Sequence, residues 1–198
     1  MGEVTDRDDF PSADIDLSPD ALGAALRDVV EYVDAEGWNQ PPMLFALVPT
    51  QVLAATHPGL VDADDDSELS PIAQEAFDAP DPDLEELLGT TVWPPTVVGA
   101  ALIQQIVVLP PEAEADLDSA FEPLLGDPDA AESAAREVAR SHPGSKVARL
   151  VVGALRDGRT LSLLQLRDDD AQPGDRIELL SHPDLAPNLV VALAATLD

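Results

Sequence analysis

All three histidines of the chain lie in one local pattern, Ser/Thr-His-Pro, at His57, His142 and His182. A histidine beside a serine can act as the general base of a hydrolase. However, the sequence contains no Gly-x-Ser-x-Gly elbow that would present such a serine. Because His-Pro and Pro-Gly steps end helices and form turns, we interpret these histidines as turn residues. No catalytic residue is predicted, and the sequence favours a protein that is not an enzyme without deciding the matter.

Metal and cofactor sites are not indicated either. The chain has no cysteine, and its histidines do not form the short-range pairs of zinc sites. Residues 62–68 begin like a calcium-binding loop, but Ser67 stands where that loop needs glycine and Ala73 where it needs glutamate. Glycine-rich nucleotide loops are absent as well. We therefore predict no metal and no cofactor.

The arginines near the end of the chain are the first candidates for binding. Asp157-Gly158 between two apolar runs predicts a β-hairpin with a two-residue turn, which places Arg156 opposite Arg159. Like charges in that position require an anion between them. The anion can be a carboxylate of the chain itself, which we favour, or it can be a ligand or an acidic partner. Arg149, on the same hairpin, completes this set of candidate binding residues.

Trp38 and Trp93 are the other two candidate binding residues. Aromatic residues make up only 4% of the chain, and each tryptophan precedes a proline pair and an apolar run. Filling of the core beside a strand entry is the interpretation we favour. The alternative is a partly exposed, rigid platform that contacts a partner.

The net charge of −29 narrows the classes of partner. Residues 1–135 contain 30 of the 39 acidic residues, and their only basic residues are Arg7 and Arg27. Such a chain repels phosphate backbones and anionic lipid surfaces, so we expect neither nucleic-acid nor membrane binding. The acidic start does not resemble a signal peptide, and the apolar stretches are shorter than a membrane span. We expect a cytoplasmic protein.

Hydrophobic periodicity and turn signals predict the elements that position these residues. Helices are expected at 18–37, around 50–56, at 81–89, at 127–144 and from Pro187 onward, with one or two helical turns at 70–77. Strands are expected at 42–48, at 97–109 and on both sides of Asp157-Gly158. Residues 1–17 are expected to be a disordered acidic tail, and residues 18–198 a single domain with an acidic excursion at 61–83.

This order predicts an α+β fold of two layers, in which helices cover one face of a mostly antiparallel sheet of four or five strands. The hairpin is apolar on both faces, whereas a sheet with one wet face alternates more cleanly. We therefore expect something to cover the second face, namely the acidic excursion or a second subunit. A homodimer or a complex with another protein follows as the predicted assembly.

Four phrases at this spacing, GWNQPPMLFALV, VWPPTVVGAALI, VLPPEAEA and ARLVVGALRDG, resemble an uncharacterised, mainly actinobacterial family of small acidic cytoplasmic proteins. The resemblance extends from about residue 18 to the end of the chain. It implies an actinobacterial origin but no activity, catalytic residue or cofactor. The element order also resembles the α+β fold of bacterial secretion chaperones, which concerns the fold alone. We predict a non-enzymatic protein-interaction module, and the alternative is a binding protein or enzyme for an anionic small molecule.

Overall fold

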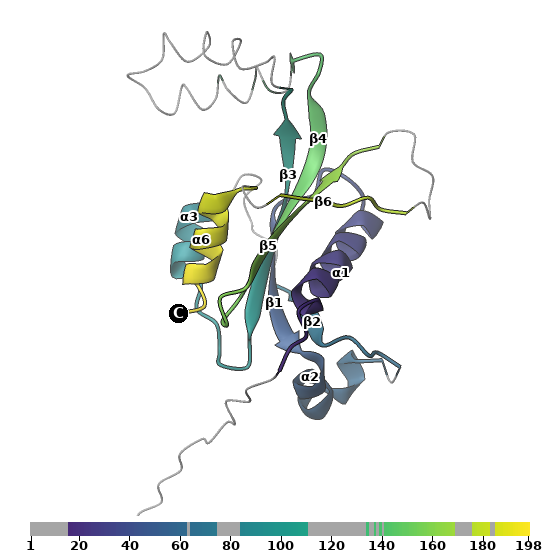
Figure 1. Cartoon of the computed structure of the whole chain (residues 1–198), viewed down its shortest axis with the longest axis vertical. Helices are drawn as coiled ribbons and strands as arrows, with labels where there is room; N and C mark the ends of the chain where they lie inside the picture. The colour runs from purple at the N-terminus through teal and green to yellow at the C-terminus, as the bar shows by residue number, and fades with distance from the viewer. Residues whose placement is uncertain are drawn as a thin grey trace, which may run out of the picture.

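The computed structural model (Figure 1) describes most of the chain between Asp16 and Asp198. The described residues are 16–62, 64–74, 84–110, 134, 137, 139, 141–168, 176–182 and 185–198. The predicted tail up to residue 15, most of the predicted helix at 127–144 and the end of the acidic excursion lie outside them. Leu17, at the end of the predicted tail, packs against the core.

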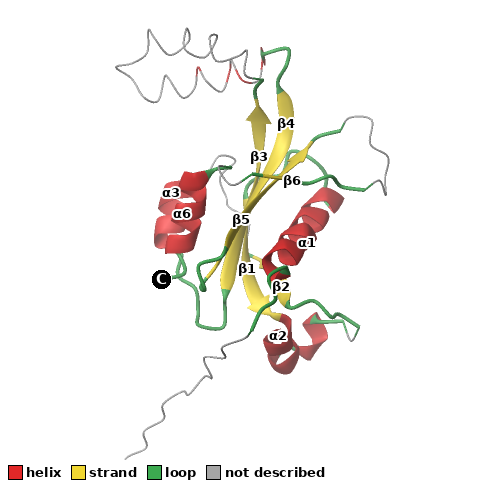
Figure 2. Ribbon diagram, viewed as in Figure 1, coloured by secondary structure: helices red, strands yellow, loops and turns green. Residues whose placement is uncertain are grey.

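An antiparallel sheet forms the centre of the molecule (Figure 2). Its six described strands lie in the order β2-β1-β3-β4-β5-β6, and every neighbouring pair is antiparallel. The predicted fold class is confirmed, although the sheet has more strands than expected. The strands are β1 (Met43–Pro49), β2 (Leu69–Ala73), β3 (Gly99–Val108), β4 (Lys146–Leu155), β5 (Thr160–Leu166) and β6 (Leu180–Ser181).

Helices cover both faces of this sheet, whereas helices were expected on one face only. Helix α1 (Ala21–Ala35) packs on one face, while α3 (Leu84–Thr90) and α6 (Pro187–Ala195) pack on the other (Figure 1). Helix α2 (Thr50–Thr56) follows β1 directly. The second sheet face, which was expected to be covered by the excursion or another subunit, is therefore covered by α3 and α6.

The central strand β4 shows why both faces needed cover. Val151 and Leu155 point into the core under α1, whereas Leu150, Val152 and Ala154 point into the core under α6. A strand buried on both faces is a continuous apolar run, and β4 therefore lacks polar alternation. Gly153 allows α1 to approach the sheet closely, because a Cβ there would lie 2.7 Å from a methyl carbon of Leu26.

The hairpin between β4 and β5 forms at the predicted place but not in the predicted register. Leu155 and Arg159 pair across a three-residue turn, with Gly158 at a φ of 90°. A turn of this length with glycine in the left-handed region shifts every pair by one residue relative to a two-residue turn. Arg156 and Arg159 consequently do not face each other, and the prediction of two opposed arginines is wrong.

The segment at 69–73 is a second correction, since it forms β2 instead of the expected helical turns. Pro71 lies within this strand and pairs with Leu47 of β1. A proline is tolerated there because β2 is an edge strand, and its missing N–H can face away from the sheet.

Candidate functional site

The most elaborate polar cluster of the described chain surrounds Arg149 on β4. Its side chain is buried, with only 3% exposed, and its Nη1 atom lies 2.5 Å from the Asp34 carboxylate at the end of α1. The same nitrogen donates to Oε1 of Gln165 at 2.9 Å, and the Gln165 amide donates to Asp34 at 2.9 Å. Arg149, Asp34 and Gln165 thus form a closed triangle that satisfies a buried charge.

The second guanidinium nitrogen of Arg149 caps the C-terminal end of α1 by binding carbonyl oxygens there. It donates to the carbonyl oxygen of Gly37 at 2.7 Å and to that of Val33 at 3.5 Å. Gly37 ends the helix in the left-handed conformation, as the sequence predicts. A cation at this position also stabilises the negative end of the helix dipole.

Trp38 lies against this cluster and is half-buried. The guanidinium carbon of Arg149 is 4.0 Å from the centre of the Trp38 ring, and that of Arg167 is 5.8 Å from it. Both distances are in the range of cation–π contacts. Trp38 therefore neither fills the core nor presents a free ring to a partner. Its ring packs against the guanidinium of a buried arginine.

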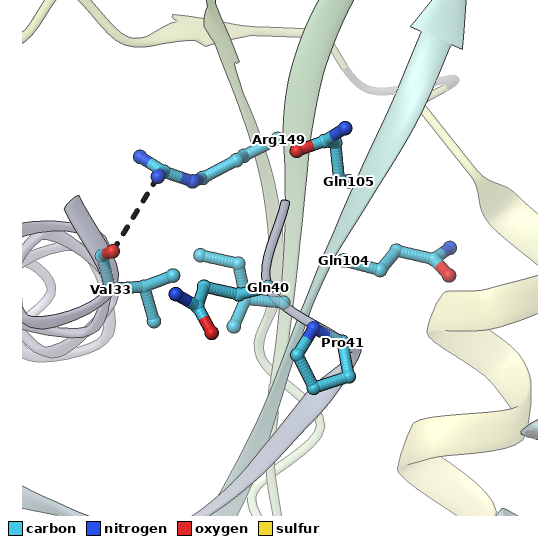
Figure 3. Close-up of a pocket in the computed structure, with 7 residues that line it drawn as sticks. Val33, Gln40, Pro41, Gln104, Gln105 and Arg149 are labelled. Atoms are coloured by element: carbon cyan, nitrogen blue, oxygen red, sulfur yellow. Dashed lines mark hydrogen bonds between the residues drawn. The ribbon is translucent and has the colours of Figure 1, made fainter. Parts of the chain in front are cut away.

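A small cavity beside Arg149 limits what could bind there (Figure 3). Its volume is about 10 Å³, and Gln40, Gln104 and Gln105 contribute to its lining. That volume accommodates about one water molecule. An anionic ligand at Arg149 would have to displace the internal partners already described.

Arg156 and Trp93 form a second internal cluster on the opposite face of the sheet. The Arg156 guanidinium donates to the carbonyl oxygens of Val97, at 2.8 Å, and of Leu197. Trp93 is 8% exposed, and its indole N–H donates to the hydroxyl of Thr196 at 2.9 Å. Trp93 is thus part of the core that lies under α6.

Arg159 ties the hairpin turn to the segment before α1. It binds Asp157 at 2.7 Å and the carbonyl oxygen of Ser18 at 2.6 Å, while Ser18 donates through its backbone N–H to Glu68 at 2.7 Å. Hydrogen bonds from Arg159 hold the pKa of Asp157 below its usual value. Those from the Ser18 hydroxyl and N–H do the same for the pKa of Glu68. The three candidate arginines therefore have partners within the chain, and a binding role for them stays a prediction.

A wide groove, which the sequence reading missed, lies between α1 and β5. Its volume is about 910 Å³. One wall consists of α1 residues, the other of residues 176–181, and Leu161 and Leu163 of β5 line it between the walls. We call it the α1–β5 groove. The α1 residues that line it are Gly23, Arg27, Val30, Glu31, Asp34 and Ala35.

The groove exists because a single helix cannot cover this face of the sheet. Six strands spaced about 4.8 Å apart span about 24 Å, whereas a helix with its side chains is about 10 Å wide. Helix α1 contacts β2, β3, β4 and β5, while two helices share the opposite face. Towards β6 no helix among the described residues covers the α1 face.

The groove also contains exposed charged side chains on both of its walls, of which Arg27 is attracted electrostatically to Asp28. Arg27 on α1 and Arg176 on the opposite wall make no hydrogen bond or ion pair in the described part of the chain. Glu31 and Glu178 lie on the same two walls and are exposed. Each wall therefore offers one positive and one negative group.

A comparison with known proteins places the chain in a family. The family model of the PPA1309-like proteins matches residues 22–198. The chain belongs to the PPA1309-like protein family. No curated protein and no solved structure matches it. The predicted likeness to secretion chaperones stays a prediction.

The histidines of this PPA1309-like protein lie at the ends of elements, where the turn interpretation places them. His57 follows α2 and bonds through its ring nitrogen to the hydroxyl of Thr56. His142 accepts from the backbone N–H of Gly144 at 3.0 Å, within the turn that leads into β4. Among the described residues, no three His, Asp or Glu side chains are grouped so that they could hold a metal ion.

Sequence reasoning missed the groove of the PPA1309-like protein for an identifiable reason. The sequence indicates one apolar stripe on α1, made of Leu22, Leu26, Val29, Val30 and Val33, and all five are buried. The neighbouring stripe that faces the groove contains charged and small residues. This pattern is typical of a helix face exposed to solvent. Within the described residues, no helix is long and apolar enough to cross a membrane.

Proposed function

We propose that the protein is a non-enzymatic protein-interaction module that binds its partner in the α1–β5 groove. The observation that carries this proposal is the groove itself, a concave surface of about 910 Å³ with apolar residues of β5 between two charged walls. An apolar strip flanked by polar groups is the usual composition of a protein-binding surface. The Arg149 cluster supports the proposal indirectly. The hydrogen-bond donors of Arg149 are already bound to acceptors of the chain itself, so they do not form a second binding site.

Cross-linking from inside the groove tests this function. A photoreactive amino acid at position 23 lies in the groove, whereas the same residue at the exposed position 51 on α2 lies outside it. We expect one defined host protein to be cross-linked from position 23 and not from position 51. Excess unlabelled protein should compete for this product. Equal products from both positions would overturn the proposal.

A second candidate function is the binding of an anionic, partly apolar small molecule. The volume of the groove is within the range of small-molecule sites, and Arg27 and Arg176 are both unpaired among the described residues. Native mass spectrometry of protein purified gently from its host separates the two candidates. A bound mass of small-molecule size, lost in the double variant Arg27→Gln/Arg176→Gln, would favour this second function.

The predicted homodimer needs a different surface from the one first expected, since α3 and α6 cover the second sheet face. We retain a homodimer as a proposal, to be tested by sedimentation over a range of protein concentrations. We also propose an actinobacterial cytoplasm as its location, on the strength of the sequence resemblance and the acidic charge. Fractionation of host cells tests that location.

A further inference from the structure

We propose that the groove binds an amphipathic α-helix of a partner protein, packed alongside α1 above β5. This inference rests on the proposed function and specifies its partner. The helix would place an apolar stripe on Leu161, Ile177 and Leu179. One of its flanks would carry a carboxylate against Arg27 and, one turn away, an ammonium group against Glu31.

The available space is the first argument for a helix. The opposite sheet face is covered by α3 and α6, whereas α1 is the only described helix on this one, where Ile177 and Leu179 also pack against the core. The uncovered part lies beside α1, where a second helix would normally complete the layer. The apolar side chains that such a helix would cover are Leu161, Ile177 and Leu179, which line the groove and are only partly buried.

The spacing of the α1 residues in the groove is the second argument. Gly23, Arg27, Glu31 and Ala35 all line the groove and succeed one another at intervals of four residues, and the last three of them are exposed. This is the spacing with which one helix contacts another along a shared seam. Gly23 at one end and Ala35 at the other are small, so the axis of a partner helix could approach α1 closely.

Charge complementarity is the third argument. Arg27 and Glu31 are four residues apart on α1, and they do not form an ion pair with each other. The order with the arginine first is the less favourable one for pairing within a helix. Arg27 has only the electrostatic attraction of its neighbour Asp28, and both Arg27 and Glu31 are exposed, so they can meet a partner whose carboxylate and ammonium groups are also separated by one turn. Arg176 and Glu178 offer a similar pair on the opposite wall.

Two synthetic peptides provide the probe. Each is a helix of about 20 residues, long enough to be helical in water. Both carry leucines at the seam spacing, and they differ only in the order of one flanking glutamate and lysine. Binding to the full chain is measured by fluorescence anisotropy. We expect one peptide to bind about tenfold more tightly than the other, because opposed like charges oppose docking.

A charge-swapped protein makes this test specific. In the double variant Arg27→Glu/Glu31→Arg, the preference between the two peptides should invert. The single variant Lys146→Glu is the matched control, because it reverses an exposed positive charge outside the groove. It should leave the preference unchanged. A preference that does not invert, or that changes equally in the control, overturns the proposal.

Filling the groove gives an independent test. A Cβ on Gly23 would lie 3.7 Å from Leu161, an ordinary contact, so Gly23→Leu should fold and extend into the groove. We expect it to abolish binding of both peptides with an unchanged circular dichroism spectrum. Failure of both peptides to bind the wild type overturns the helix. If the position-23 cross-link persists in that case, the interaction module survives without a helical partner. Self-association of the wild type that Gly23→Leu abolishes would assign the groove to a second copy.

Discussion

The guanidinium of Arg149 lies between the Asp34 carboxylate, 2.5 Å away, and the face of Trp38, whose centre is 4.0 Å away. Asp34 and Arg149 are separated by 115 residues, so this contact joins the end of α1 to the middle of the sheet. The cluster therefore fixes the orientation of α1, which forms one wall of the groove.

Replacing Arg149 by methionine should lower the free energy of unfolding by about 3 kcal/mol. Removal of the guanidinium leaves the buried side chain of Gln165 and two helix-end carbonyls without their donor, and it takes the ion partner from Asp34, whose side chain is 38% exposed. Lys146→Met is the control, because it removes an exposed positive charge from the same strand and should change stability by less than about 0.5 kcal/mol. Urea unfolding measures both. Equal losses would contradict a structural role for the cluster.

The buried indole of Trp93 yields a second prediction. Thr196→Val keeps the shape of the side chain but leaves the indole N–H without its acceptor. This should cost about 1–3 kcal/mol of unfolding free energy. Thr196→Ser retains the hydroxyl and should lose less. Thermal unfolding of both variants provides the comparison, and a serine variant as unstable as the valine variant would refute the hydrogen bond.

Two glycines should respond to alanine with opposite signs. Gly158 has a φ of 90°, so Gly158→Ala should destabilise the protein by about 1 kcal/mol through the backbone alone. Gly23 lies inside α1 with room for a methyl group, so Gly23→Ala should stabilise it by about 0.5–1 kcal/mol. Urea unfolding of the pair decides this, and two changes of the same sign would contradict the geometry.

Acid should weaken the attachment between Ser18, Glu68 and the hairpin turn. The pKa values of Glu68 and Asp157 are lowered in the folded state, so the unfolded chain binds more protons as the pH falls. Their contribution is present above the unfolded pKa values, near 4, and is lost below them. Ser18→Ala should make stability less dependent on pH in this window. A steeper dependence in that variant, measured by unfolding between about pH 3 and pH 6, would contradict the assignment.

The sequence predicted the elements that local chemistry determines. The apolar runs at 42–48 and 97–109 form β1 and β3, and Asp157-Gly158 forms a hairpin turn. The predicted register of the hairpin was wrong because the length of the turn depends on the backbone conformation of one residue, Gly158. The sequence around it fits a turn of two residues as well as a turn of three. Strand β2 was missed because Pro71 and the surrounding acidic residues conceal an edge strand that only pairing with β1 stabilises.

The candidate site was predicted less well, for a physical reason. Arginines were correctly expected to find partners within the chain, but two of the acceptors of Arg156 are backbone carbonyls, which side-chain composition does not reveal. The groove depends on how many helices cover each sheet face. That number is a property of the assembled layers, and no local pattern encodes it.

The position of α6 near the end of the chain affects how the protein folds while it is being synthesised. Strands β1 to β5 all precede α6, yet Leu102, Leu150 and Val152 are buried in the core that α6 covers. A nascent chain that has completed these strands therefore displays an apolar sheet surface that α3 covers only in part until α6 has emerged from the ribosome. During that interval aggregation competes with folding, and the closure of this face follows translation of α6 instead of accompanying that of the strands.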